Sequence, residues 1–339
     1  MRPRSSSLLA AAAVGGLIAL AGCGGGGSNG SLPNDPKAAL SASVGNLSNS
    51  DVLTTTFKLD ISPTDLQALA RADGDKLTTA DAEAIASAQL VFQAKTSDGS
   101  NLSENNGHKT DASIRVLSGG STYLEMRVLS GDLFLNADVK GFLGLIHKDK
   151  TWAEVQARAG SLPPFVQAIV NGKWVTLSGA AAQGLASNFG ITTPPSNGAR
   201  SQRMVNELKR ILTGDVSVTR AGSDDRGDHL VITGNTRKLA TDLYSAVAGS
   251  VPGAGAALSQ AKPQDVPSRS ITVDAWVKDG VLSEISLDVA QFAKPGEAAG
   301  KHLPVALTFE QSGDDIEKPA NATPVDLSQL GGLLGALSG

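Results

Sequence analysis

Hydrophobic and polar residues alternate with a period of two through most of the chain after residue 50. Such alternation is typical of half-buried antiparallel strands. Gly119-Gly120, Ser130-Gly131 and Asp279-Gly280 lie between neighbouring runs and predict tight hairpin turns. The runs that predict strands are 53–59, 88–95, 113–116, 122–128, 133–137, 172–177, 216–218, 230–232, 271–277, 281–289 and 303–309.

Other stretches have helical spacing and lie between the hairpins. Asp35 predicts the N-cap of the first helix, and Thr79 is expected to cap a turn before a short helix that follows residues 63–72. Because strands mostly follow strands directly, the pattern predicts an α+β fold with a large antiparallel sheet, rather than alternating parallel units. Residues 190–199 are rich in Thr, Pro, Asn and Gly and mark a possible internal boundary. The predicted helices are 35–49, 63–72, 152–170 with a break at Pro163-Pro164, 180–188, 201–212 and 236–248.

The first residues follow the pattern of a secretory signal. Arg2 and Arg4 give a positive start, residues 8–20 are apolar, and Leu20-Ala21-Gly22-Cys23 places two small residues before a thiol. This tetrad resembles the bacterial lipobox, which implies diacylglycerol transfer to Cys23, cleavage between Gly22 and Cys23, and further acylation, for example by palmitate. The alternative is an ordinary cleaved signal in which Cys23, the single cysteine of the chain, has no such role.

The signal peptide is therefore predicted to cover residues 1–22. A glycine-rich lipidated tether follows at residues 23–34, an α+β domain at 35–325, and a Gly/Leu-rich tail at 326–339. We expect the protein to be anchored by lipid to the cell membrane and to face outside the cytoplasm. The tail is too short and too rich in glycine to cross a bilayer.

Charge and composition exclude several classes of partner. Without Arg2 and Arg4 the chain has 27 basic residues against 33 acidic ones, a net charge of −6. It has no basic patch interleaved with aromatic residues, so a nucleic-acid partner is not expected. Aromatic residues make up 4% of the chain, which disfavours the exposed platforms of carbohydrate-binding modules. A single cysteine also excludes an internal disulfide.

Two runs near the C-terminus and one in the middle resemble a known family. "SITVDAWVKDGVLSEISLDVA" followed by "LPVALTFEQSGDDIEKPANATPVD", and "TYLEMRVLSGDLFLNADVKGFLGL", are similar to the hairpins and final extended segment of LppX/LprG-type lipoproteins. The resemblance implies a curved antiparallel half-barrel, with helices packed on one side and an apolar cavity for acyl chains. LolA-type carriers have a related architecture. The helices near 152–212 have no counterpart in the family, and they could fill the cavity.

No catalytic, cofactor or metal site is predicted. The four histidines, His108, His147, His229 and His302, lack metal-ligand spacing. The acidic stretch 72–83 departs from a calcium loop at its first carboxylate positions, so a turn before a helix is the simpler interpretation. Ser259-Gln260-Ala261-Lys262 matches one box of the penicillin-binding enzymes without its companions. Asp224-Asp225 and Asp314-Asp315 fit turns, and Trp276 fits either a cavity wall or a second core layer.

Two functions remain open from the sequence. The first is a membrane-anchored lipoprotein that binds or carries a lipid or other amphiphile in an apolar cavity. The second is a non-catalytic structural or interaction lipoprotein with a filled core, which presents its loops to a protein or a cell-wall polymer. An enzyme is not expected, because no nucleophile, base and orienting group can be assembled.

Overall fold

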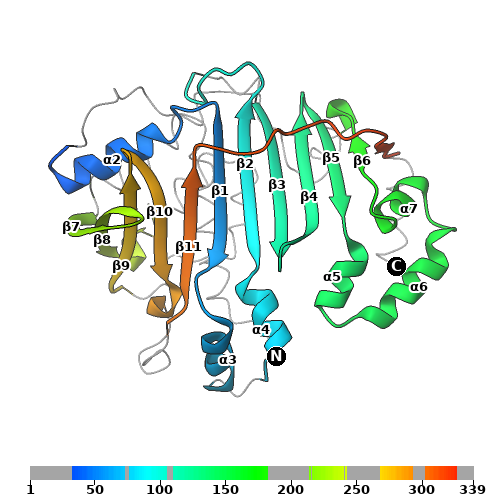
Figure 1. The fold of residues 1–339 in the computed structure, drawn as a ribbon, viewed down its shortest axis with the longest axis horizontal. Coiled ribbons are helices and arrows are strands. Elements are labelled where there is room, and N and C mark those ends of the chain that lie inside the picture. Colours follow the sequence, from blue (N-terminus) through cyan, green and yellow to red (C-terminus); the bar gives the residue numbers. More distant parts are fainter. Residues whose placement is uncertain are drawn as a thin grey trace. The chain divides into compact units, whose positions relative to one another are not determined.

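The computed structural model describes residues 33–72, 76–104, 110–181, 214, 216–239, 241–242, 268–292 and 302–326. In this part of the chain, twelve strands follow one another in the hydrogen-bonded order β12-β6-β5-β4-β3-β2-β1-β11-β10-β9-β8-β7. Strand β12 pairs with β6 in parallel, whereas β1 with β11, β3 with β4, β4 with β5, β5 with β6, β7 with β8, β8 with β9, β9 with β10 and β10 with β11 are antiparallel. The predicted α+β class with a large, mainly antiparallel sheet is confirmed. The chain divides into two compact units, and Figure 1 labels the elements that belong to them.

Unit 1 comprises residues 1–60, 94–110 and 194–313. Its strands lie in the order β1-β11-β10-β9-β8-β7, and helix α2 packs against β10 and β7. The bounds are α2 Pro36–Asn46, β1 Val52–Leu59, β7 Val216–Asp224, β8 Gly227–Asn235, β9 Ser270–Lys278, β10 Val281–Asp288, a 3-10 helix Val289–Phe292 and β11 Pro304–Glu310.

Local chemistry explains the boundaries of these elements. The side chain of Asp35 accepts a hydrogen bond from the backbone N–H of Ala38, so the predicted N-cap of α2 is confirmed. Asp279 and Gly280 both have positive φ, 52° and 80°, as a tight turn between β9 and β10 requires. The predicted hairpin is therefore confirmed at this position.

The core of unit 1 is densely packed with aliphatic side chains. Helix α2 and the loop after it contribute Leu40 and Leu47, which are almost completely buried. They pack against alternate residues of the sheet, as the period-two pattern predicted. The buried residues of this cluster are Leu40, Leu47, Leu53, Leu102, Val216, Leu230, Ile232, Ala275, Val277, Leu282, Leu307 and Phe309.

Unit 2 comprises residues 61–93, 111–193 and 314–339. Strand β2, Gln89–Thr96, begins in this unit, and its residues from Ala94 on belong to unit 1. The other elements are α3 Pro63–Ala72, α4 Thr79–Ala86, β3 Thr110–Ser118, β4 Ser121–Leu129, β5 Asp132–Ala137, α5 Val139–Leu145, α6 Asp149–Ala159, α7 Pro164–Val170, β6 Val175–Leu177 and β12 Thr323–Pro324.

Three details differ from the prediction. The cap of α4 is Thr78 rather than Thr79, and Thr78 forms a reciprocal capping box with Asp81. Helix α5 and strand β12 were not predicted. The predicted helices 180–188, 201–212 and 236–248, and the boundary at 190–199, lie largely outside the described residues.

Candidate functional site

The C-terminal segment 314–322 covers one face of the sheet in unit 2 (Figure 1). The backbone carbonyl of Asp314 accepts a hydrogen bond from the side chain of Gln93 on β2, and its carboxylate lies 3.9 Å from Arg115 on β3. Arg127 on β4 donates to the carbonyl of Glu317, 2.6 Å away. Lys318 lies over the ring of Phe134 on β5. The segment thus crosses strands β2 to β5 on the side of the sheet that carries Gln93, Arg115, Arg127 and Phe134.

The opposite face of the same strands is apolar. Because side chains alternate along a strand, the residues between those under the C-terminal segment point to the other side. The pairing places them in rows across the sheet: Ile114 lies opposite Met126, and Met126 opposite Leu135. We call this set the apolar face: Ala112, Ile114 and Val116 of β3, Leu124, Met126 and Val128 of β4, Leu133, Leu135 and Ala137 of β5, and Val175 and Leu177 of β6.

Helix α7 covers only the β6 side of the apolar face. Phe165 and Ala168 of α7 are buried against Val175, with Leu135 packed beside them. On the central strand β4, by contrast, Leu124 and Val128 each remain 37% exposed. The middle of the apolar face therefore keeps large aliphatic side chains in contact with solvent, which is costly unless something apolar covers them.

The exposed large hydrophobic residues of the described chain all lie in unit 2. They are Ile85, Leu124, Val128, Phe142 and Ile146. Besides the two on β4, they come from helices α4 and α5. The side chain of His147, just after α5, contacts Asp81 at the start of α4, with 2.5 Å between Nε2 and Oδ1. The two helices are thus joined by a polar contact.

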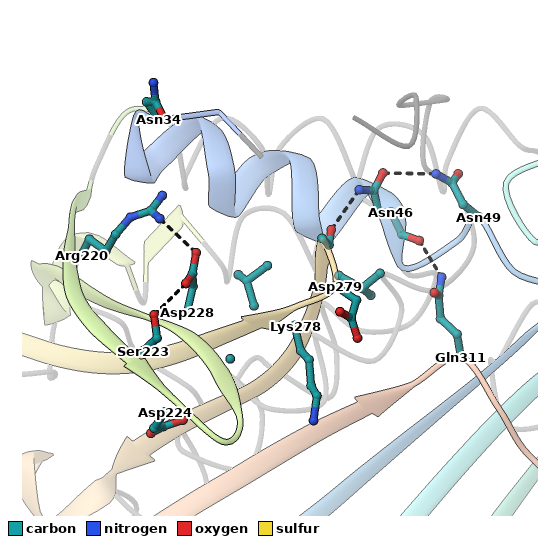
Figure 2. A pocket seen from close by; sticks show the side chains of 14 residues that line it. Asn34, Asn46, Asn49, Arg220, Ser223, Asp224, Asp228, Lys278, Asp279 and Gln311 are labelled. Atoms are coloured by element: carbon teal, nitrogen blue, oxygen red, sulfur yellow. Dashed lines mark hydrogen bonds and ion pairs between the residues drawn. The ribbon is translucent and has the colours of Figure 1, made fainter. Parts of the chain in front are cut away.

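A polar pocket lies in unit 1 (Figure 2). It has a volume of about 790 Å³ and lies between α2, the β7–β8 hairpin and the β9–β10 turn. Arg220 pairs with Asp228 at 2.9 Å, and Ser223 donates to the same carboxylate group. Its lining residues are Asn34, Asn46, Asn49, Arg220, Ser223, Asp224, Gly227, Asp228, Val277, Lys278, Asp279, Gly280, Val281 and Gln311. This lining does not fit the acyl-chain cavity that the family resemblance implies.

The amide side chains of this polar pocket bond mainly to each other and to the backbone. Asn46 donates to the carbonyl of Gly280 at 2.9 Å, and Asn49 donates to Asn46. Gln311 donates to the carbonyl of Asn46 at 2.7 Å (Figure 2). These bonds tie the end of α2 to the β9–β10 turn and to the end of β11. The pocket residues that bond in this way act chiefly in stabilising unit 1.

Trp276 is at the centre of a polar cluster on β8, β9 and the β7–β8 turn. Its indole N–H donates to Asp224 at 3.0 Å, and the Arg226 guanidinium lies 3.6 Å from its ring centroid. Arg226 also donates to Asp224, which holds the pKa of that carboxyl below its usual value. Trp276 is buried, as the interpretation of a second core layer expected, and its neighbours in that layer include charged side chains.

The histidines that the structure describes pair with single carboxylates. His229 contacts Asp274 at 2.7 Å, and His302 contacts Asp288 at 2.8 Å. No group of three or more His, Cys, Asp or Glu side chains able to hold a metal ion occurs among the described residues. His108, the acidic residues Asp73 and Asp75, and the Ser259–Lys262 box (residues 259–262) lie outside them.

The predicted lipidation site also lies outside the described residues. Gly22 and Cys23 precede residue 33, where the described chain begins, and most of the tail 326–339 follows residue 326, where it ends. Within the described ranges, no helix has both the length and the apolar composition needed to cross a bilayer. The sequence analysis did not single out the apolar face as a candidate site, although the alternation over 112–116, 124–128 and 133–137 indicated which of its residues share a side.

No protein-family model matches the chain, and no curated protein matches it in sequence. Among solved structures, lipoprotein LppX of Mycobacterium tuberculosis is 8% identical, with a TM-score of 0.34; the match covers 83% of this chain and 97% of LppX. LprF of Mycobacterium bovis is 10% identical, with a TM-score of 0.37; the match covers 86% of this chain and all of LprF. LppX is a member of the family whose resemblance the sequence indicated.

Proposed function

We propose that the chain is an exported lipoprotein, anchored through Cys23, that binds the acyl part of a lipid or another amphiphile against the apolar face of unit 2. The observation that supports this function is the partial cover of the face. Helix α7 buries Val175 on β6, whereas Leu124 and Val128 on β4 are 37% exposed. Leu124, Met126 and Val128 are successive residues on one side of a strand, and a contiguous apolar patch of this kind often marks a ligand-binding or partner-binding surface.

Binding at this surface would be non-covalent. An acyl chain laid across β3, β4 and β5 would cover the side chains around Met126, and each Å² of apolar area removed from water contributes roughly 25 cal/mol. The opposite face cannot serve in the same way, since segment 314–322 occupies it through Gln93, Arg127 and Phe134. The proposal therefore assigns the ligand to one face and involves no enzymatic step.

The first experiment asks whether an amphiphile is present. Native mass spectrometry of the protein purified from its own host should show a bound lipid that is lost on delipidation. The delipidated protein should then take up a fluorescent fatty-acid probe. A protein that carries no lipid and takes up no probe would contradict the proposal.

The second experiment places the ligand. Leu124→Asp puts a charge in the centre of the apolar face, and we expect it to weaken probe binding at least about tenfold, because burying an unpaired carboxylate is costly. Thr122→Asp is the matched control, since Thr122 is exposed on the same strand and pairs with Leu117, which points to the side opposite Val116, the partner of Leu124. Equal probe binding by the two variants would exclude the apolar face as the site.

A structural or interaction lipoprotein is the second candidate, and unit 1 supports it. Its core contains a cluster of buried aliphatic side chains, and its pocket is lined mainly by amide and charged side chains. Crosslinking of the intact protein in its native envelope distinguishes the two functions. A single protein or polymer partner captured through unit 1, from a protein that carries no lipid, would favour this second function.

A further inference from the structure

The last residues that the structure describes lie beside the apolar face. The backbone N–H of Val325, just after β12, donates to the carbonyl of Thr176 on β6 at 2.8 Å. The side chain of Val325 packs against the buried cluster of α7 and β6, and Leu135 of the apolar face packs against the same cluster. Asp326 follows and is exposed. The chain from residue 327 onward therefore continues from a point next to the apolar face.

A row of paired residues leads from this point to the exposed middle of the apolar face. Leu177 directly follows Thr176 on β6; it pairs with Leu133 of β5, and Leu133 pairs with Val128 of β4. Val128 is one of the two exposed large hydrophobic residues of β4, at 37%. Neighbouring strands are about 4.8 Å apart, so β4 lies about 10 Å from β6. The exposed side chains are therefore within reach of a segment that begins at residue 327.

Residues 327–339, which lie outside the described part of the chain, carry leucines at helical spacing. We call these residues the leucine segment. It has no charged residue, and on a helix its leucines would occupy one side about 120° wide. A helix of this length extends about 20 Å, enough to cross from β6 to β3, which are about 14 Å apart. The leucines are Leu327, Leu330, Leu333, Leu334 and Leu337.

The glycines of the leucine segment make its helix depend on a surface. Glycine inside a helix is unfavourable, so Gly331, Gly332 and Gly335 disfavour a helix that stands alone. Packing of an apolar side supplies most of the stability of helices in proteins, and it would offset this cost. The apolar face presents uncovered aliphatic side chains, and the leucine segment has aliphatic side chains to cover. The two surfaces are therefore complementary.

We propose that the leucine segment docks as a helix on the apolar face of its own molecule, with its leucines against Leu124 and Val128. A single residue, Asp326, separates the segment from Val325, which already packs on this side of the sheet. So short a link gives the segment a much higher effective concentration at the face than a second copy of the chain would have. Docking needs no ligand, whereas the inference that an amphiphile must displace the segment rests on the proposed function.

The first experiment is photocrosslinking in the full chain, with the photoreactive amino acid p-benzoylphenylalanine in place of Val128. The delipidated protein is irradiated, and mass spectrometry of the monomer locates the crosslinked residue. We expect it within residues 327–339. The same amino acid in place of Thr122, which is exposed on β4 and points to the other side, should form no such crosslink. Docking is refuted if the Val128 position forms no crosslink to the leucine segment, or forms one only to a second chain.

The second experiment changes the leucine side of the segment. Leu330→Ser with Leu334→Ser should lower the yield of the crosslink from position 128 at least about fivefold, because burial of each leucine contributes a factor of about ten or more to docking. Gln329→Ser with Ala336→Ser is the matched control, since these positions lie on the opposite side of the helix. It should keep the yield within about twofold. Equal loss in the two variants would overturn docking through the leucines.

The third experiment measures whether docking limits ligand binding. A docked segment raises the apparent Kd by the inverse of the undocked fraction. The Leu330/Leu334 variant should therefore bind the fatty-acid probe at least about threefold more tightly than the control, and equal affinity would refute the competition. Crosslinking without any probe uptake supports docking and contradicts the carrier function. Probe uptake without crosslinking does the reverse, so the two failures are distinguishable.

Discussion

The imidazole of His229 stacks face to face on the indole of Trp276, with ring centroids 4.7 Å apart and ring planes within 5° of parallel. The two residues are direct cross-strand partners on β8 and β9. Arg226 contacts the same indole, and Asp224 accepts its N–H. Trp276 is therefore buried in part by the polar and charged side chains of His229, Arg226 and Asp224.

Removing this indole should destabilise unit 1 strongly. Trp276→Ala deletes a side chain that is only 4% exposed, and we expect it to lower the free energy of unfolding by about 3–5 kcal/mol. Trp276→Phe keeps an aromatic ring but loses the hydrogen bond to Asp224, so its cost should be about 1–2 kcal/mol. Urea denaturation monitored by circular dichroism measures both. Equal stability of the two variants would show that the indole body contributes nothing beyond its hydrogen bond.

Replacement of Gly227 by alanine should lower the free energy of unfolding, whereas replacement of Gly45 by alanine should raise it. Gly227 has φ of 125°, and an added Cβ would lie 2.3 Å from the carbonyl oxygen of Val277. Gly227→Ala should therefore cost about 3 kcal/mol or more, since the neighbouring backbone would have to move. Gly45 lies in α2 with nothing within 4 Å of the added atom. Gly45→Ala should raise stability by about 0.5–1 kcal/mol, and thermal unfolding of the two variants tests the contrast.

The carboxyl group of Asp288 should make the stability of unit 1 depend on pH in the acidic range. Partial burial acts to raise the pKa of its carboxyl, but hydrogen bonds from the backbone N–H of Leu303, from the side chain of His302 and from the backbone N–H of Ala290 hold the pKa below its usual value. A carboxyl whose folded pKa is lowered stabilises the fold fully above its unfolded pKa of about 3.9. This stabilisation is lost as the pH falls through the folded pKa.

The measurement compares the urea midpoint of the wild type with that of Asp288→Asn over a range of pH. The wild type should be more stable near neutral pH, and the difference should narrow below about pH 3.9. Asp60→Asn, at an exposed position, serves as the control. The difference between its urea midpoint and that of the wild type should stay constant over the same range of pH. If the difference between the urea midpoints of the wild type and Asp288→Asn became larger as the pH falls, the ionised carboxyl of Asp288 would not be the stabilising form.

Membrane attachment through Cys23 should depend on its thiol. Cys23→Ala, or treatment of the producing cells with globomycin, should release the protein from the membrane fraction, because two acyl chains are needed for stable anchoring. Fractionation followed by immunoblotting gives the result. Persistence in the membrane fraction after both treatments, at unchanged abundance, would show that the anchor is not the lipid.

Much of the fold could be predicted from local patterns. Asp35 caps α2, Asp279-Gly280 turns between β9 and β10, and Gly119-Gly120 adopts the positive φ values that the hairpin needs. These features depend on a few adjacent residues, so a sequence contains them completely. Helix α5 was missed because Gly141 and Gly144 weaken its helical pattern. Its cap at Asp138 and its close approach to Tyr123 stabilise it through contacts that sequence spacing does not show.

The apolar face illustrates the same limit. Alternation in β4 indicated that Leu124, Met126 and Val128 share a side, but it could not indicate which side is covered. That depends on segment 314–322, which crosses the strands on the side of Arg127 and Phe134. The covering segment lies nearly two hundred residues from β4, so local pattern carries no information about the contact.

The sequence by itself determined most of the strands and turns, and it predicts lipidation at Cys23, because hydrophobic period, turn chemistry and a cleavage motif are all properties of neighbouring residues. Only the tertiary structure decided that Trp276 lies among charged side chains and that Leu124, Val128 and Phe142 stay exposed. The physical reason is that burial is a relation between distant segments: a side chain is covered or left exposed according to what the rest of the chain places upon it.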